Sequence, residues 1–169
     1  AAYQFVDLSY LKSLRSRLRA LCSDWQLRGT ILLSTEGINL FVAGERWSTD
    51  LLLAELRSIA GLENLAVKIS ASDRPPFNRM LVRIKREIIP FGVPGIDPAR
   101  RPAAKLSPCE LKQWLDEGRP ITLLDTRNDY EVKLGTFRDA LPIGIQHFRQ
   151  FPQAADRLPA ELKQRPIVM

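Results

Sequence analysis

Cysteine, histidine and long apolar runs are all scarce in this sequence. Its 169 residues include two cysteines, Cys22 and Cys109, and a single histidine, His147. Two cysteines are too few for a disulfide framework and suit the reduced cytoplasm, and the lack of a Cys/His cluster argues against a structural zinc site. No apolar segment approaches the roughly 20 residues that span a bilayer. We therefore expect a cytoplasmic protein with no membrane span, no metal site and no evident cofactor.

The last residues of the chain have the pattern of an interrupted strand. The chain ends on Pro166, Ile167, Val168 and Met169, with no turn or polar tail after them. Domains rarely end inside an apolar strand, because its neighbours and its exit loop are then missing. We expect a fragment that is cut on its C-terminal side within a domain.

Positive charge is concentrated in the first part of the chain. The formal net charge is +6, and residues 1–90 contain 13 Lys and Arg against 9 Asp and Glu. Residues 107–169 contain 9 of each and are neutral. An excess of this kind suits a polyanion such as RNA, but a basic surface that only keeps the protein soluble would look the same.

Residues 1–90 predict a βαββαβ order of elements. Apolar alternation indicates strands at 3–8, 28–34, 38–43 and 65–69. Helical spacing indicates one helix after a cap at Ser9 and a second that starts at Ser48 or Thr49 and stops at Gly61. This order is the ferredoxin-like arrangement, a four-stranded antiparallel sheet with two helices on one face.

A fifth strand and a linker follow. Residues 79–88 alternate between apolar and basic side chains, which predicts an additional strand. Residues 91–106 begin with a segment too rich in proline and glycine to form a regular element. We therefore expect a ferredoxin-like domain over 1–90, a linker over 91–106 and a second domain over 107–169.

Residues 107–169 have an α/β pattern. Ser107, Pro108 and Glu110 have the spacing of a helix N-terminus with a capping box. Ile121–Leu124 is a short apolar run typical of a buried parallel strand. A helical pattern over His147–Gln164 is broken by Pro152 and Pro159, and a strand begins at Ile167. The fold class is thus α+β, a ferredoxin-like domain followed by part of an open parallel sheet.

Asp125 and Arg127 are the candidate site residues of the second half. They follow the strand directly, and ligands of open parallel sheets bind outside the carboxyl ends of the strands. Asp125 can hold loop amides or pair with Arg127, and Arg127 can steer an anionic group toward the site. An ordinary ion pair that pins the loop would need the same two residues.

Several motifs resemble one known family. The run LLDTRNDYEVKLGTF (123–137) is similar to the front half of a rhodanese domain, with Thr136 in place of the usual His after the Gly. Together with other motifs it resembles the rhodanese-containing family of oxygen-dependent tRNA uridine hydroxylases, which make 5-hydroxyuridine at the wobble position. These motifs are FRQFP (148–152), LRGTILLSTEGIN (27–39), PFNRMLVRIKREII (76–89) and GVPGIDP (92–98).

The resemblance implies a chemistry that depends on a cysteine outside the chain. The family's nucleophile is a cysteine in the loop after the strand that Ile167 begins, so it is expected shortly after Met169. Cys22 lies near the apolar stripe of the first predicted helix, and Cys109 reads as a small residue of a capping turn. We therefore expect residues 1–169 alone to be inactive, with molecular oxygen as the implied co-substrate and tRNA as the implied partner.

A basic stretch is the candidate RNA-binding segment. Arg79, Arg83 and Lys85 lie at alternate positions of a predicted strand, about 7 Å apart per step. Arg86 follows directly, and Lys68 on the preceding predicted strand can add to the stripe. Edge strands also carry Lys and Arg to prevent edge pairing, and the resemblance favours RNA over that alternative.

Three functions therefore remain for comparison. The first is tRNA hydroxylation, as the resemblance implies. The second is a rhodanese-type sulfurtransferase that uses a cysteine persulfide, which the second half alone would suggest. The third is a non-catalytic module that binds RNA or protein.

Overall fold

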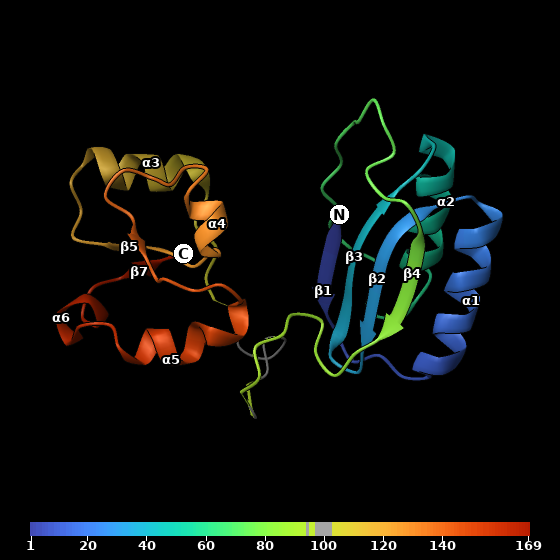
Figure 1. Ribbon diagram of the computed structural model, residues 1–169, viewed down its shortest axis with the longest axis horizontal. Helices are drawn as coiled ribbons and strands as arrows, with labels where there is room; N and C mark the ends of the chain where they lie inside the picture. Colours follow the sequence, from blue (N-terminus) through green and yellow to red (C-terminus); the bar gives the residue numbers. More distant parts are fainter. Residues whose placement is uncertain (94, 97–102) are drawn as a thin grey trace. The chain divides into compact units, whose positions relative to one another are not determined.

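A computed structural model describes residues 1–93, 95–96 and 103–169 (Figure 1). These residues form two compact units, one made of residues 1–89 and the other of residues 90–93, 95–96 and 103–169. The predicted linker over 91–106 falls partly outside the described residues, at positions 94 and 97–102. No helix in the described ranges has the length and apolar character to cross a membrane.

The first unit is a four-stranded mixed sheet covered by two helices on one face (Figure 1). The elements follow in the order β1 (Ala2–Phe5), α1 (Leu11–Asp24), β2 (Arg28–Ser34), β3 (Gly37–Ala43), α2 (Arg46–Arg57) and β4 (Met80–Ile84). The strand order is β1-β3-β2-β4, where β3 is antiparallel to both β1 and β2 and β4 is parallel to β2.

Alternation along the central strands creates the core. Ile31 and Leu33 of β2 pair in register with Leu40 and Ile38 of β3, and all four side chains are buried. Because successive strand residues point to opposite faces, these side chains share the face that the helices cover. The helices and β4 add further buried side chains to the same cluster, namely Leu18, Cys22, Leu52, Leu56 and Val82.

The predicted helix boundaries of the first unit need correction. Helix α1 is preceded by Tyr10, which has a left-handed backbone with φ 54° and makes no side-chain capping bond, so Ser9 is not the cap. Helix α2 begins at Arg46, ahead of the predicted Ser48 or Thr49, and ends at Arg57, before Gly61. Buried apolar side chains on both helices determine their extent more strongly than cap preference does.

The predicted strand over 65–69 is also wrong. This segment forms no regular strand, although the backbone of Lys68 exchanges two hydrogen bonds of 2.8 Å with Ala1. Leu65 is fully buried, so apolar burial rather than sheet pairing explains the alternation. The additional strand is β4, which covers Met80–Ile84 instead of the predicted 79–88 and makes the sheet mixed rather than antiparallel.

The second unit contains the expected parallel sheet. Helix α3 (Pro108–Asp116) begins with a capping box between Ser107 and Glu110. Strand β5 (Thr122–Asp125) lies between β6 (Leu141–Pro142) and β7 (Ile167–Val168), and is parallel to both. Helix α4 (Asp129–Val132) follows β5. The two-residue strand β6 gives too short a pattern to be predicted from the sequence.

The helical pattern over 147–164 resolves into three short pieces. A 3-10 turn (Phe148–Gln150) leads into α5 (Phe151–Asp156), and α6 (Ala160–Lys163) follows. Pro152 lies in the first turn of α5, where proline needs no hydrogen-bond partner, so it starts a helix instead of breaking one. Phe91 packs against Phe148 and Phe151, with ring centroids 5.8 and 6.0 Å away.

A substitution at Gly37 tests how closely β1 packs on β3. Its φ is +147°, and an added Cβ would lie 2.1 Å from the carbonyl oxygen of Gln4. We expect Gly37→Ala to lower the free energy of unfolding by at least about 2 kcal/mol, through strain and forced separation of the strands. Urea unfolding followed by circular dichroism measures this loss.

Gly44→Ala is the matched control, because its added methyl group would lie 2.5 Å from the end of the Leu27 side chain and no closer than 3.8 Å to a backbone atom of that residue. Equal losses of stability in the two variants would contradict the close approach of β1 and β3 at Gly37.

Candidate functional site

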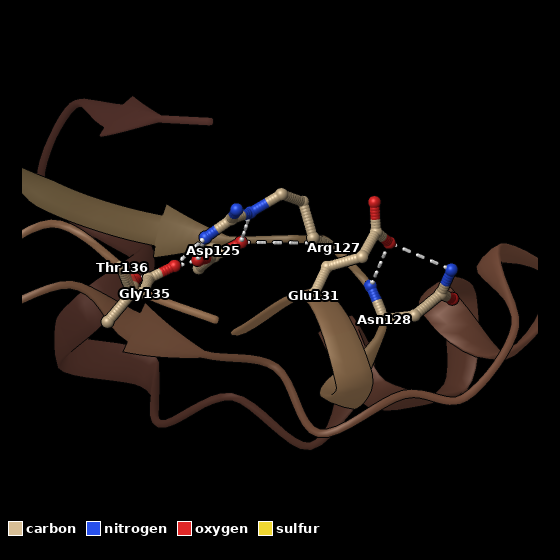
Figure 2. A network of polar contacts seen from close by, with 6 residues as sticks. All are labelled: Asp125, Arg127, Asn128, Glu131, Gly135 and Thr136. Atoms are coloured by element: carbon tan, nitrogen blue, oxygen red, sulfur yellow. Dashed lines mark hydrogen bonds and ion pairs between the residues drawn. The ribbon is translucent and has the colours of Figure 1, made fainter. Parts of the chain in front are cut away.

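Asp125 is the centre of a polar cluster at the carboxyl end of β5 (Figure 2). Its carboxylate accepts hydrogen bonds from Nε and Nη2 of Arg127 at 2.9 and 2.6 Å. It also accepts from the backbone amide of Arg127 at 3.1 Å and from Oγ1 of Thr136 at 2.7 Å. Four donors thus surround one carboxylate. The predicted contacts of Asp125, to a loop amide and to the Arg127 side chain, are both among them.

The same guanidinium closes the loop after β5. Nη2 of Arg127 also donates to the carbonyl oxygen of Gly135 at 2.7 Å, so one side chain joins the beginning of the loop to its end. Thr136 makes the second link, because its hydroxyl reaches Asp125 from the far side of the loop. Residues 125–136 are therefore held as a closed loop by polar contacts.

Burial and charge make this cluster asymmetric. The side chain of Asp125 is 8% exposed, whereas that of Arg127 is 46% exposed. Hydrogen bonds from Arg127 hold the pKa of Asp125 far below its usual range, and the carboxylate raises the pKa of Arg127. The carboxylate of Asp125 is thus a fixed anion with little exposure to solvent. The guanidinium of Arg127 is fixed on the side that faces Asp125, and the rest of that side chain is open to solvent.

A second set of contacts joins the loop to the next segment of the unit. The carboxylate of Glu131 accepts hydrogen bonds from the backbone amide and from Nδ2 of Asn128, at 3.0 and 2.9 Å. Asn128 also forms an isolated parallel bridge with Ile145, which is buried. The start of α4 is therefore attached to the loop after β6 (Figure 2 shows the Asn128–Glu131 pair).

Sequence reasoning named Asp125 and Arg127 but missed the residues that complete the cluster. Thr136 was identified only as a departure from the usual His, and its hydrogen bond to Asp125 spans 11 positions. A hydroxyl this far along the chain has no local signal that would pair it with the carboxylate. The structure brings both candidates into one cluster, and their role as residues that support catalysis remains a prediction.

Neither cysteine belongs to this cluster. Cys22 is part of the apolar core of the first unit, where burial raises the pKa of its thiol to about 11. A thiol with such a pKa is a poor nucleophile at neutral pH. Cys109 is exposed in the first turn of α3. Within the described ranges, no group of three or more His, Cys, Asp and Glu residues is arranged to hold a metal ion.

The predicted basic stripe lies along the edge strand β4. Arg79, Arg83 and Lys85 are exposed at alternate positions, and Val82 between them is buried in the core. Arg86 is exposed as well, and its carbonyl oxygen accepts a hydrogen bond of 2.8 Å from Ser34. The predicted alternation is therefore present from Arg79 to Lys85, and Arg83 is the member of the stripe that lies within β4 itself.

Lys68 does not belong to that stripe. Its backbone pairs with Ala1, beside β1, and β1 and β4 are the two outer strands of the sheet. The expectation that Lys68 adds to the basic stripe is therefore wrong. The reason is topological, because the segment that precedes a strand in the sequence lies here at the opposite edge of the sheet.

The arrangement defines a protein with two parts, a mixed α/β unit with basic side chains along one edge strand and a parallel-sheet unit with a charged loop. A family model described as the UPF0176 acylphosphatase like domain matches residues 1–88. The chain belongs to this UPF0176 family.

Curated relatives cover nearly the whole chain. It is 45% identical over 173 residues to a protein of Cupriavidus necator named tRNA uridine(34) hydroxylase, with 99% of this chain and 61% of that protein covered. Relatives with the same name occur in Ralstonia nicotianae, at 47% identity with 91% of this chain and 56% of the relative covered, and in Burkholderia vietnamiensis, at 46% identity with 99% and 62% covered. The chain thus spans about three fifths of the length of these relatives.

Replacing Asp125 with Asn tests the charged loop. We expect Asp125→Asn to lower hydrogen-exchange protection of the Arg127 amide about tenfold at pH 7, because charge-assisted bonds to the carboxylate are lost. The depressed pKa of Asp125 means that its stabilisation is present above the unfolded pKa of about 4 and is lost as pH falls below it. The protection factor of the wild-type loop should therefore drop between pH 5 and pH 2, and that of the variant should not.

Asp139→Asn is the control for this measurement. Asp139 is exposed and forms no ion pair with any residue that the structure describes. If the protection factor of the Arg127 amide is the same in the two variants, the carboxylate of Asp125 does not hold the loop.

Proposed function

We propose that these 169 residues act as part of an enzyme that hydroxylates uridine 34 of tRNA. The observation that carries the proposal is the identity of about 45% to proteins named tRNA uridine(34) hydroxylase across nearly the whole chain. Identity at this level extends over both units, so the proposal does not depend on either one alone. The oxygen dependence and the product 5-hydroxyuridine come from the family resemblance of the sequence motifs, with molecular oxygen as co-substrate.

The first unit is the part that we propose to contact tRNA. Arg83 is exposed on the edge strand β4, and Arg79, Lys85 and Arg86 are exposed directly before or after that strand. The four strands of this sheet, all within the described residues, contain no Asp or Glu. Cations on strands that contain no acids favour the binding of a polyanion, since phosphate contacts supply most of the sequence-independent affinity for nucleic acid.

The second unit is, in this proposal, the leading part of a rhodanese-like domain. Its parallel sheet and the charged loop at the carboxyl end of β5 support that assignment. Asp125 and Arg127 act here as positioning residues, since they hold the loop in place through the contacts to Gly135 and Thr136. Such a loop can fix the geometry of neighbouring groups at the sheet edge, where ligands of parallel sheets bind.

Nucleoside analysis of tRNA tests the proposed reaction. Deletion of the gene should abolish 5-hydroxyuridine and its derivatives at position 34, and the wild-type gene should restore them. The variant Arg127→Ala should restore about a tenth of the wild-type level, because the loop loses its link to Gly135. Mass spectrometry of digested tRNA measures these levels.

The same samples separate the rival functions. Loss of a thiolated nucleoside with unchanged hydroxylation would point to a sulfurtransferase instead. No change in any modified nucleoside would point to a non-catalytic binding module. Arg138→Ala is a suitable control, since Arg138 is an exposed cation of the same unit outside the Asp125 cluster.

Replacing the basic stripe tests the contact to tRNA. We expect the triple change of Arg79, Arg83 and Lys85 to Gln to weaken binding of tRNA to the 169-residue chain at least about tenfold at low salt. The slope of log K against log salt should fall by up to about 0.9 for each phosphate contact that is lost. The fold should persist, because exposed charges contribute under about 1 kcal/mol each.

Two further triple variants serve as comparisons. In the first, Lys112, Arg119 and Lys163 of the second unit are changed to Gln, which lowers the net charge by the same amount. Each of these three side chains makes a local hydrogen bond within the second unit. In the second comparison, Lys12, Arg15 and Arg19 on the exposed side of α1 are changed to Gln. If the stripe variant and the second-unit variant bind tRNA with the same affinity and the same salt slope, the stripe only protects a sheet edge. If the α1 variant weakens tRNA binding more than the stripe variant does, tRNA contacts α1 instead of the stripe.

A further inference from the structure

The first unit has a second sheet face, opposite the two helices. Register and alternation place on it the residues that lie between the core positions of each strand. Tyr3 of β1 pairs with Asn39 of β3, which pairs with Leu32 of β2, which pairs with Arg83 of β4. One row of side chains therefore crosses this face from an aromatic ring at one edge to a guanidinium at the other.

A neighbouring row has the same character. Phe41 of β3 pairs with Thr30 of β2, which pairs with Leu81 of β4. Tyr3 and Phe41 are diagonal neighbours on adjacent strands, a relation that separates Cα atoms by about 7–8 Å. Phe5 belongs to the same face, because its ring contacts that of Tyr3 edge-on at 6.3 Å.

The aromatic rings of this face are open to solvent. Tyr3, on the outer strand β1, is 58% exposed, and Phe41 is 54% exposed although it lies on the inner strand β3. Isolated apolar side chains are common on protein surfaces, whereas several exposed aromatic rings that share one face with a row of cations indicate a binding surface. Flat rings on a sheet surface are suited to stack against other flat groups.

Cations surround the rings on the same face. Arg28 and Thr30 alternate on β2, and Arg79 precedes Leu81 and Arg83 on β4, so all three arginines belong to this face. The backbone amide of Gly29 donates to the carbonyl oxygen of Arg79 at 2.9 Å, which brings Arg28 and Arg79 side by side. None of these arginines forms an ion pair with a residue that the structure describes.

One end of the face is closed by the chain itself. Asn39 donates from Nδ2 to the carbonyl oxygen of Ile88 at 3.0 Å, and Glu36 accepts from the Ile88 amide at 2.7 Å. Ile88 is fully buried, and the hydroxyl of Ser34 donates a hydrogen bond of 2.8 Å to the carbonyl oxygen of Arg86, two residues earlier in the chain. The open region is therefore bounded, and it contains Tyr3, Phe41 and the three arginines.

We propose that this open face binds unpaired nucleotides of RNA, with bases stacked on Tyr3 and Phe41 and phosphates on Arg28, Arg79 and Arg83. The inference rests on the proposed function and deepens it, because it assigns the first unit to a single-stranded stretch of its RNA substrate instead of a helical stem. A base can reach a ring only when its own stacking is broken, and stacked or paired bases present no free face. The cations, and the lack of Asp and Glu on the four strands, favour RNA over a protein segment as the occupant.

Binding of short RNAs to the 169-residue chain tests the proposal. The probes are a fluorescent oligouridine of ten nucleotides and the same strand annealed to its complement. Wild-type protein should bind the single strand more tightly than the duplex. The double variant Tyr3→Leu, Phe41→Leu should bind the single strand about 100-fold more weakly, about tenfold for each ring, with an unchanged salt slope and less than a twofold change for duplex.

Trp47→Leu is the matched control. Trp47 is 57% exposed, as the two rings are, but it lies on α2, which belongs to the other face of the sheet. Thermal unfolding by circular dichroism checks that each variant folds. Should the double variant not fold, Phe41→Leu alone should weaken single-strand binding about tenfold, and Phe41→Tyr should retain it.

Three results would overturn the inference. The first is a double variant that binds the single strand as Trp47→Leu does. The second is a preference of the wild-type protein for duplex, and the third is selective capture of an extended peptide with no measurable RNA binding. None of these results would affect nucleoside analysis of tRNA from the deletion strain, so failure of this inference is distinguishable from failure of the proposed reaction.

Discussion

Burial of one side of the β2–β3 hairpin is the constraint on which the first unit depends. Ile31 and Leu33 face Leu40 and Ile38 across the hairpin, and all four are covered by the helices. Since side chains alternate along a strand, burial of this set determines that Thr30, Leu32, Asn39 and Phe41 lie on the other side. A slip of one residue would expose the core set and bury Thr30 and Asn39 in its place, so the hairpin has one acceptable register.

The position of β4 follows from that hairpin. Val82 pairs with Ile31 and extends the buried row, which places Arg83 on the open face beside Leu32. The cations of this strand are therefore exposed for the same reason that its apolar residues are buried. Two glycines permit the strands to approach, since a Cβ at Gly29 or Gly37 would collide with a neighbouring backbone carbonyl. Packing and surface chemistry in this unit thus have a common origin.

A buried anion organises the second unit in a different way. Asp125 loses most of its solvent at the end of β5 and is compensated by Arg127 and Thr136. A carboxylate that is nearly excluded from water needs such partners, because an unpaired buried charge is costly. Since the partners come from both ends of the loop, satisfying the charge also closes the loop. This reciprocity explains why an exposed connection between short elements has a defined shape.

The sequence by itself determined the elements whose signals are local. Strand alternation at 28–34 and 38–43, the capping box at Ser107 and the alternation of Arg79, Arg83 and Lys85 all depend on near neighbours. The tertiary structure alone decided the features that join distant positions. It placed Lys68 beside Ala1 at the far edge of the sheet, made β4 parallel to β2, and brought Thr136 to Asp125. Local patterns indicate which side of an element is apolar. Which strand pairs with a given edge, and which residue pairs with a buried charge, depends on the tertiary fold of the whole chain.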